Sequence, residues 1–126
     1  MVGDVNAAIE AVGHSLLSGV FVWAGFNHFL NFDAVAGMIA SRGYPLAKPG
    51  LIAASIVEIV AGACIAIGAY RAPAAIMLIA FTIAATAALL DFWRFTGPER
   101  DALKSTFTIN FAVVGGLMLT ASRAST

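Results

Sequence analysis

Charged residues are scarce in this chain. Only 11% of its 126 residues are Asp, Glu, Lys or Arg, whereas 60% are hydrophobic. Soluble domains carry about 25% charged residues. The seven basic and seven acidic residues also cancel, so the chain has no net charge to attract the phosphates of a nucleic acid. This composition excludes an ordinary soluble domain and argues against nucleic-acid binding.

Cysteine and histidine are rare as well. The single cysteine, Cys64, cannot form the intrachain dithiol that disulfide-exchanging membrane enzymes use. His14 and His28 would lie about 21 Å apart along a helix, too far for both to bind one metal ion or haem. The sequence also lacks flavin, haem and iron–sulfur motifs. We therefore expect no metal site and no resident electron carrier.

What the chain does contain is four apolar segments, each long enough to cross a bilayer, which takes about 20 residues. We expect a single domain, residues 1–126, with these spans: about 8–30, 49–70, 73–93 and 103–121. Pro49 and Pro73 open the second and third spans in the first helical turn, where proline is tolerated. Asp4 and Glu10 replace the basic start of a cleavable signal peptide, so we expect none.

The third apolar segment excludes a soluble four-helix bundle, in which every helix needs a polar face toward water. Its run APAAIMLIAFTIAATAALLDF carries only Thr82 and Thr86 before Asp91. Four such spans joined by short connections are expected to form an antiparallel, all-α bundle in the membrane. The small residues available where these helices approach one another are Gly19, Gly25, Ala54, Gly62, Gly115 and Gly116.

The connection between the first two spans is patterned like a short helix at the membrane interface. Asp33 can cap its start and Gly43 can end it. Val35, Ala36 and Ile39 fall on one face of that helix. An irregular loop is the alternative for this segment.

Basic residues flanking the spans predict the orientation of the chain in the membrane. The first and third connections carry most of them, namely Arg42, Lys48, Arg94, Arg100 and Lys104. Only Arg71 and Arg123 lie on the other side. The positive-inside rule then places these two connections in the cytoplasm and both termini outside.

Hydrogen-bonding side chains lie within the apolar spans, in the half of the bilayer nearest the first and third connections. Glu58 lies roughly 12 Å deep, counted from Pro49, and Asn110 roughly 10 Å deep, counted from Leu103. A polar group facing lipid costs several kcal/mol, so we expect these side chains to face inward and form a ligand-binding pocket. The candidate pocket residues are Asn27, His28, Glu58, Asp91, Arg94 and Asn110.

Glu58 is the most informative of these candidates. A carboxyl group within the membrane indicates a pocket, a proton-exchanging role or a buried partner. The alternative is a structural clasp, in which Glu58 is hydrogen-bonded to Asn110 or His28 and only fixes the bundle. For Asp91 and Arg94, three residues apart at a helix end, a surface ion pair is the simpler interpretation.

Several motifs occur in a definite order along the chain. GFNHF ends the first span, YP follows in the connection, EIVAGACIAIGAYRAPA runs from the second span into the third, and N-F-x-x-x-G-G lies in the fourth. From about Ser15 to Leu119, this order resembles the DoxX family of small four-span membrane proteins. The family's recurrent positions are matched here by Glu58, Gly62, Gly68, Arg71 and Asn110. Asn27-His28 departs from it, because many relatives have a histidine or glycine followed by lysine there.

The resemblance implies a multi-pass protein of the bacterial cytoplasmic (inner) membrane. DoxX-like proteins are linked with the membrane subunit of thiosulfate:quinone oxidoreductase, so it implies a redox-associated subunit with a quinone as its ligand. As an enzyme, such a protein would be an accessory subunit that takes electrons from a soluble or membrane-bound redox partner. More distant members act as assembly chaperones or cargo receptors, which makes a non-catalytic binding protein the alternative. The sequence leaves homo-oligomerisation open.

Overall fold

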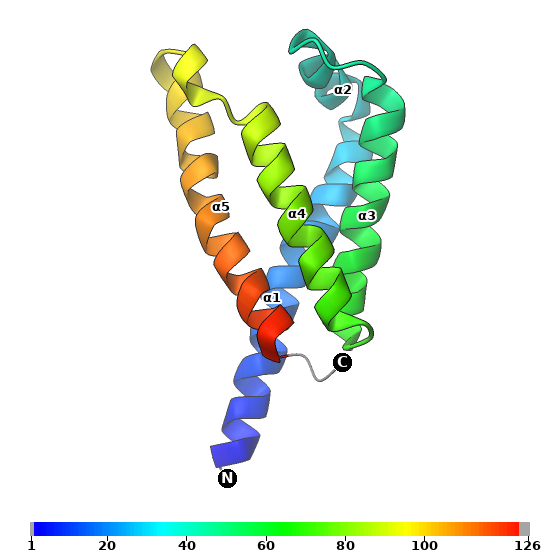
Figure 1. The fold of residues 1–126 in the computed structure, drawn as a ribbon, viewed down its shortest axis with the longest axis vertical. Coiled ribbons are helices and arrows are strands. Elements are labelled where there is room, and N and C mark those ends of the chain that lie inside the picture. Colours follow the sequence, from blue (N-terminus) through cyan, green and yellow to red (C-terminus); the bar gives the residue numbers. More distant parts are fainter. Residues whose placement is uncertain (1, 124–126) are drawn as a thin grey trace.

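The computed structural model describes residues 2–123, which contain helices and no strand. Four of these helices are long and apolar enough to cross a membrane, and a short helix lies between the first two. Figure 1 shows that neighbouring long helices run in opposite directions, which confirms the expected all-α bundle. The elements are α1 (Val2–Leu30), α2 (Phe32–Ser41), α3 (Ala47–Ile67), α4 (Arg71–Leu89), η1 (Phe92–Arg94) and α5 (Gly97–Arg123).

The helices differ from the expected spans mainly at their ends. α1 and α5 begin several residues before the apolar runs, because backbone hydrogen bonding continues into polar flanking sequence. α3 ends at Ile67, where Gly68 adopts a left-handed conformation with φ 80°. The third apolar run is not one continuous helix, since α4 stops at Leu89 and the short helix η1 follows it.

The short helix α2 confirms one of its two expected ends. Gly43 terminates it with φ 85°, and its N–H donates to the Ala40 carbonyl at 2.9 Å. The prediction that Asp33 caps the start was wrong, because Asn31 is the N-cap residue and no side chain makes a capping bond. α1 leads almost directly into α2, with the Asn31 N–H donating to the Asn27 carbonyl, so Asp33 already lies within the first turn.

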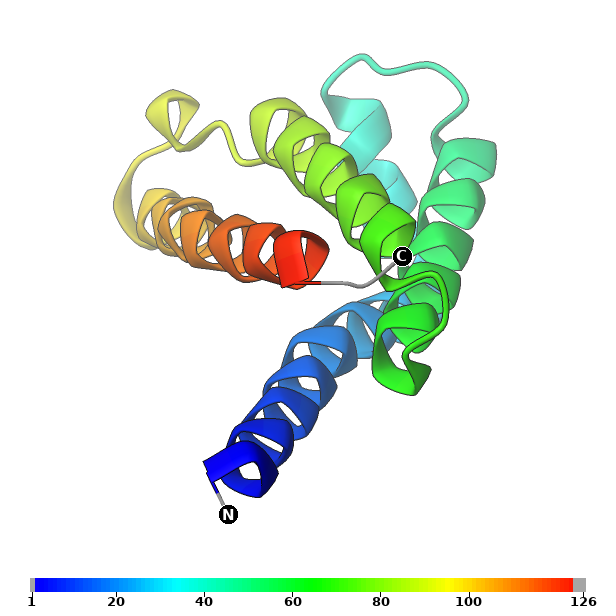
Figure 2. The ribbon, with the colours of Figure 1, turned by 60° about the horizontal axis from the view of Figure 1, so that its bottom comes forward.

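The bundle consists of two closely packed helix pairs, α1 with α3 and α4 with α5. The two pairs are joined along α3 and α4, whereas α1 and α5 make few contacts and diverge from one another, as Figure 2 shows. The outward faces of the long helices carry exposed apolar side chains such as Leu16, Ile83 and Phe111. These faces suit the lipid environment that the composition predicts.

Two glycines allow the close approach of α1 and α3. A Cβ atom added to Gly25 would lie 2.5 Å from Cγ1 of Ile59 and 2.8 Å from the Ser55 carbonyl oxygen. A Cβ atom added to Gly62 would lie 3.0 Å from Cγ2 of Val22. The two distances at Gly25 leave no room for a side chain, and the distance at Gly62 is tighter than an ordinary contact, so the expected use of both glycines in helix packing is confirmed.

The same expectation was wrong for two glycines on α1 and α5. A Cβ atom on Gly19 or Gly115 would have no described atom within 4 Å, and one on Gly116 would only touch the Leu17 side chain at 3.7 Å. The physical reason is that α1 and α5 make few contacts, so these glycines lie outside a close approach of two helices. Small residues permit close packing but do not require it.

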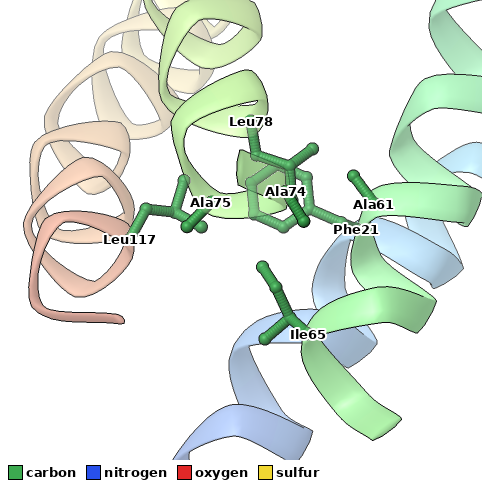
Figure 3. Packing of buried hydrophobic residues seen from close by; sticks show 7 residues of the cluster. All are labelled: Phe21, Ala61, Ile65, Ala74, Ala75, Leu78 and Leu117. Carbon is green, nitrogen blue, oxygen red and sulfur yellow. The ribbon is translucent and has the colours of Figure 1, made fainter. Parts of the chain in front are cut away.

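The apolar core lies at the end of the bundle farthest from α2. Figure 3 shows side chains from all four long helices meeting there: Phe21, Ala61, Ile65, Ala74, Ala75, Leu78 and Leu117. Ile65, Leu78 and Leu117 are fully buried. The opposite half of the bundle, beside α2, contains a cavity.

Candidate functional site

A cavity of about 320 Å³ lies between the long helices in the half of the bundle nearest α2. Most of its wall is apolar, with Phe21 and Ala24 from α1, Phe81 from α4 and Val113 from α5. The polar side chains that line it come from all four long helices and are His28, Glu58, Thr82, Thr106 and Asn110. Three of the six candidate pocket residues therefore share one cavity.

Glu58 and His28 form the polar centre of this cavity. Oε1 of Glu58 lies 3.0 Å from Nδ1 of His28, and the Oγ of Ser55 lies 3.3 Å from the same nitrogen. Glu58 is only 3% exposed, so its carboxyl group is removed from water. Of the two partners considered for Glu58, the structure brings His28 to it.

Two residues that line the cavity each carry a buried oxygen that lacks a hydrogen-bond partner among the described residues. One is Oγ1 of Thr82, a residue that is 5% exposed, and the other is Oε1 of Glu58. The Glu58–His28 distance is short, but its angle does not suit a hydrogen bond, so we treat it as a close polar contact. Sequence reasoning missed Thr82, which it used only to exclude a water-facing helix.

Asn110 reaches the cavity wall but is engaged by another residue. Its side-chain Nδ2 donates to Oγ1 of Thr86 at 2.8 Å, which ties α5 to α4. The clasp considered between Asn110 and Glu58 is therefore not the one the structure contains. Thr86 was visible in the sequence as a polar residue inside the third apolar run, and this was the only signal for its role.

Asn27 does not line the cavity, although it is adjacent to His28 in sequence. Its side-chain Oδ1 accepts a hydrogen bond from Nδ2 of Asn31 at 3.1 Å, at the junction of α1 and α2. Consecutive helical residues point about 100° apart, so only one of the two can face the bundle interior. His28 occupies that position, and Asn27 stabilises the turn into α2.

Asp91 and Arg94 also lie outside the cavity wall. Asp91 is buried, and its Oδ1 accepts a hydrogen bond from Nε of Arg42 at 3.1 Å. The expected partner, Arg94, lies 3.7 Å from Oδ2 with a side chain that is 68% exposed. The main partner of Asp91 is thus Arg42, which lies 49 positions away. In the sequence, Arg42 served only to predict the orientation in the membrane.

The Arg42–Asp91 pair fixes α2 against the end of α4. Tyr44 adds a second link, because its hydroxyl donates to the Ala88 carbonyl at 3.3 Å. Three apolar residues of α2, Val35, Met38 and Ile39, line the cavity on this side. The short helix is therefore the cover of the cavity toward the membrane surface.

The geometry supports proton chemistry and the binding of a polar group. A carboxyl group and an imidazole 3.0 Å apart can pass a proton once a small rotation of either side chain aligns them. The hydroxyl of Thr82 can donate a hydrogen bond to a ligand or accept one. Among residues 2–123, no group of three or more His, Cys, Asp or Glu side chains is placed to hold a metal ion.

Four membrane-length helices around a polar-lined cavity define a small multi-pass integral membrane protein. The chain belongs to the DoxX family, whose sequence profile, described as DoxX, matches residues 12–91. It is 26% identical over 102 residues to the inner membrane protein YphA of Escherichia coli (strain K12), covering 81% of this chain and 73% of YphA. No solved structure matches the chain. The predicted family and inner-membrane location are confirmed.

Proposed function

We propose that this DoxX-family protein is a quinone-linked membrane subunit whose cavity binds the ring of a quinone and its two carbonyl groups. The observation that carries the proposal is a pair of buried oxygens without a hydrogen bond among the described residues, on Glu58 and Thr82, two residues that line a largely apolar cavity. A buried polar atom without a partner costs about 1–3 kcal/mol. Such atoms at the wall of a cavity favour a ligand that supplies the missing hydrogen bonds.

The cavity suits a quinone ring in size and chemistry. Its volume of about 320 Å³ is at the lower end of the range for small-molecule sites, and its walls are mainly apolar, as in such sites. A quinone ring is flat and apolar with two carbonyl oxygens. The Thr82 hydroxyl and the His28 ring can donate hydrogen bonds to carbonyl groups.

The Glu58–His28 pair supplies what this chain itself can contribute to quinone chemistry. Reduction of a quinone to a quinol consumes two electrons and two protons. The pair can hold a proton inside the membrane and deliver it to a carbonyl oxygen. The electrons come from a partner oxidoreductase, so the protein acts as an accessory subunit and the ring provides the redox chemistry when it is bound.

Native mass spectrometry after gentle extraction from the membrane tests this function, with organic extraction to identify what the protein retains. We expect the wild type to retain a quinone and Glu58→Gln to retain several-fold less, because Gln keeps the side-chain shape but removes the exchangeable proton. Thr82→Val removes one hydroxyl at nearly constant volume and should act in the same direction. Glu99→Gln, at an exposed carboxylate on α5, is the matched control and should retain as much as the wild type.

Two results would contradict the quinone proposal. One is a wild-type protein that retains no small molecule but copurifies with a polypeptide, which would favour assembly or cargo binding instead. The other is equal quinone retention by Glu58→Gln, Thr82→Val and the Glu99→Gln control. Thermal unfolding of each variant in the same detergent shows whether lower retention reflects lost binding or lost folding.

A further inference from the structure

We infer that the cavity opens sideways into the bilayer between α1 and α5, and that its ligand is a membrane-dissolved amphiphile. The polar head of this ligand lies at Glu58 and His28, and its apolar tail leaves the cavity between the two helices. The inference rests on the proposed function for the identity of the head and adds the tail and its path.

The cavity is closed toward the membrane surface. Val35, Met38 and Ile39 of α2 line it on that side. Two contacts hold this cover in place, the Arg42–Asp91 pair at 3.1 Å and the hydrogen bond from Tyr44 to Ala88 at 3.3 Å. Direct entry from the aqueous side would require both contacts to break.

The cavity is also closed toward the opposite membrane surface. The apolar core lies there, with Ile65, Leu78 and Leu117 fully buried (Figure 3). Phe21 belongs both to this core and to the cavity wall, so it forms the floor of the cavity. A polar ligand could not cross this layer without losing its hydrogen bonds.

Two of the lateral faces are closed by close helix packing. α1 and α3 approach so closely that Gly25 has no room for a Cβ atom and Gly62 has room for one only if its neighbours shift. α4 and α5 are joined by the hydrogen bond from Asn110 to Thr86 at 2.8 Å. Neither of these faces offers a path from the lipid to Glu58.

The third face, between α3 and α4, is joined by the apolar core at one end. At the other end it is covered by α2, which packs on α3 and is linked to the end of α4 through Arg42 and Asp91.

The remaining face, between α1 and α5, is open. These two helices make few contacts and diverge, as Figures 1 and 2 show. Val20 of α1 and Thr106 of α5 both line the cavity and are both exposed, Val20 by 55% of its surface. Met38 of α2 and Gly50 of α3 also line the cavity and are exposed, but they lie on the side that α2 covers. Val20 and Thr106 instead lie on two helices that make few contacts with each other, so we place the opening there, facing the hydrocarbon of the bilayer.

A lateral opening selects the chemical class of the ligand. A molecule that arrives through the hydrocarbon must be soluble there, so it needs a large apolar part. Its carbonyl groups can then accept hydrogen bonds from the Thr82 hydroxyl and the His28 ring while the tail stays in lipid. A small hydrophilic ligand has neither the path nor the apolar contact that this arrangement provides.

The test uses the full-length protein in nanodiscs and two probes, a benzoquinone with a long isoprenoid tail and the same ring without a tail. Native mass spectrometry gives the affinity of each probe. We expect the wild type to bind the tailed probe more tightly. Val20→Trp should weaken that binding by roughly tenfold, because the indole fills the tail path, and should change the affinity of the bare ring less than about twofold.

Thr106→Trp narrows the opening from the α5 side and should reproduce the effect of Val20→Trp. It keeps the test decisive if one variant folds poorly. Val12→Trp is the matched control, because Val12 is also exposed on α1 but does not line the cavity. This variant should bind both probes as the wild type does.

Three outcomes would overturn the inference, and they differ in what they say of the proposed function. If both opening variants bind the tailed probe normally, the tail does not pass between α1 and α5, although the quinone site stands. If both probes weaken equally, Val20 and Thr106 contact the ring and the tail path is wrong. If the wild type binds neither probe, the quinone function itself fails, and the inference fails with it.

Discussion

Two arginines approach Asp91, but their surroundings differ sharply. The Arg42 side chain is 11% exposed and donates from Nε to a carboxylate oxygen at 3.1 Å, whereas the Arg94 side chain is 68% exposed and lies 3.7 Å away. An exposed ion pair contributes little, because water screens it. A buried carboxylate that loses its partner is costly, because its charge is then uncompensated. The contact with Arg42 therefore contributes more to the stability of the fold than the contact with Arg94 does.

Arg42→Met should destabilise the protein by about 2–4 kcal/mol, since it removes the buried partner of Asp91. Arg94→Met should cost less than about 0.5 kcal/mol and is the control. Unfolding in a mixed detergent–denaturant titration measures both. Equal effects of the two substitutions would show that Asp91 does not depend on Arg42.

At the scale of the helix, the α1–α3 pair is the most constrained part of the bundle. Gly25 and Gly62 differ from the glycines of α5, because their missing Cβ atoms define how close α1 and α3 can come. The Glu58–His28 contact spans this same pair, so its 3.0 Å distance depends on that approach. Packing at the glycines thus positions the polar centre of the cavity.

Gly25→Ala should destabilise the protein by about 1–3 kcal/mol, because the new methyl group would overlap Ile59 and the Ser55 carbonyl. Gly115→Ala should be neutral or stabilising by up to about 1 kcal/mol, because alanine favours the helix and has open space there. Thermal unfolding of both variants in one detergent makes the comparison. A neutral Gly25→Ala would contradict the tight packing of α1 against α3.

At the scale of the whole molecule, the start of α1 and the end of α5 lie at one end of the bundle, and α2, η1 and the α4–α5 connection lie at the other (Figure 1). The second end carries most of the basic residues. Arg42 contributes to this charge although it also pairs with Asp91. The positive-inside rule still predicts that α2 and the α4–α5 connection face the cytoplasm.

Cysteine labelling tests this orientation. In a Cys64→Ala background, Glu99→Cys places a thiol on the predicted cytoplasmic side, and Tyr70→Cys places one in the exposed connection on the other side. A membrane-impermeant maleimide applied to intact spheroplasts should label Tyr70→Cys only. Labelling of Glu99→Cys without membrane disruption would reverse the topology.

Much of the fold could be predicted because it depends on short-range properties. The length of each apolar run predicts a membrane span, and Pro49 and Pro73 lie in the first turns of α3 and α4 as expected. The end of α2 at Gly43 follows from one residue's conformational freedom. The start of α2 could not be predicted in this way, because α1 continues almost to Asn31 and leaves Asp33 inside a turn.

The candidate site was predictable only in part. The depth of Glu58 and Asn110 follows from the helical rise per residue, which places both in the same half of the bilayer. Their partners depend on how each helix is rotated about its axis. Arg42 and Thr86 became partners of Asp91 and Asn110 through contacts between helices, for which the sequence contains no periodic signal.

The sequence by itself determined that the protein resides in a membrane, that it has four spans and that a carboxyl group at mid-span, Glu58, must face inward. Each of these follows from the cost of placing polar groups in hydrocarbon, which is a property of the residues alone. Only the tertiary structure decided that His28 meets Glu58, that Asp91 meets Arg42 and that α1 and α5 diverge. These outcomes depend on the rotation and tilt that packing imposes on whole helices.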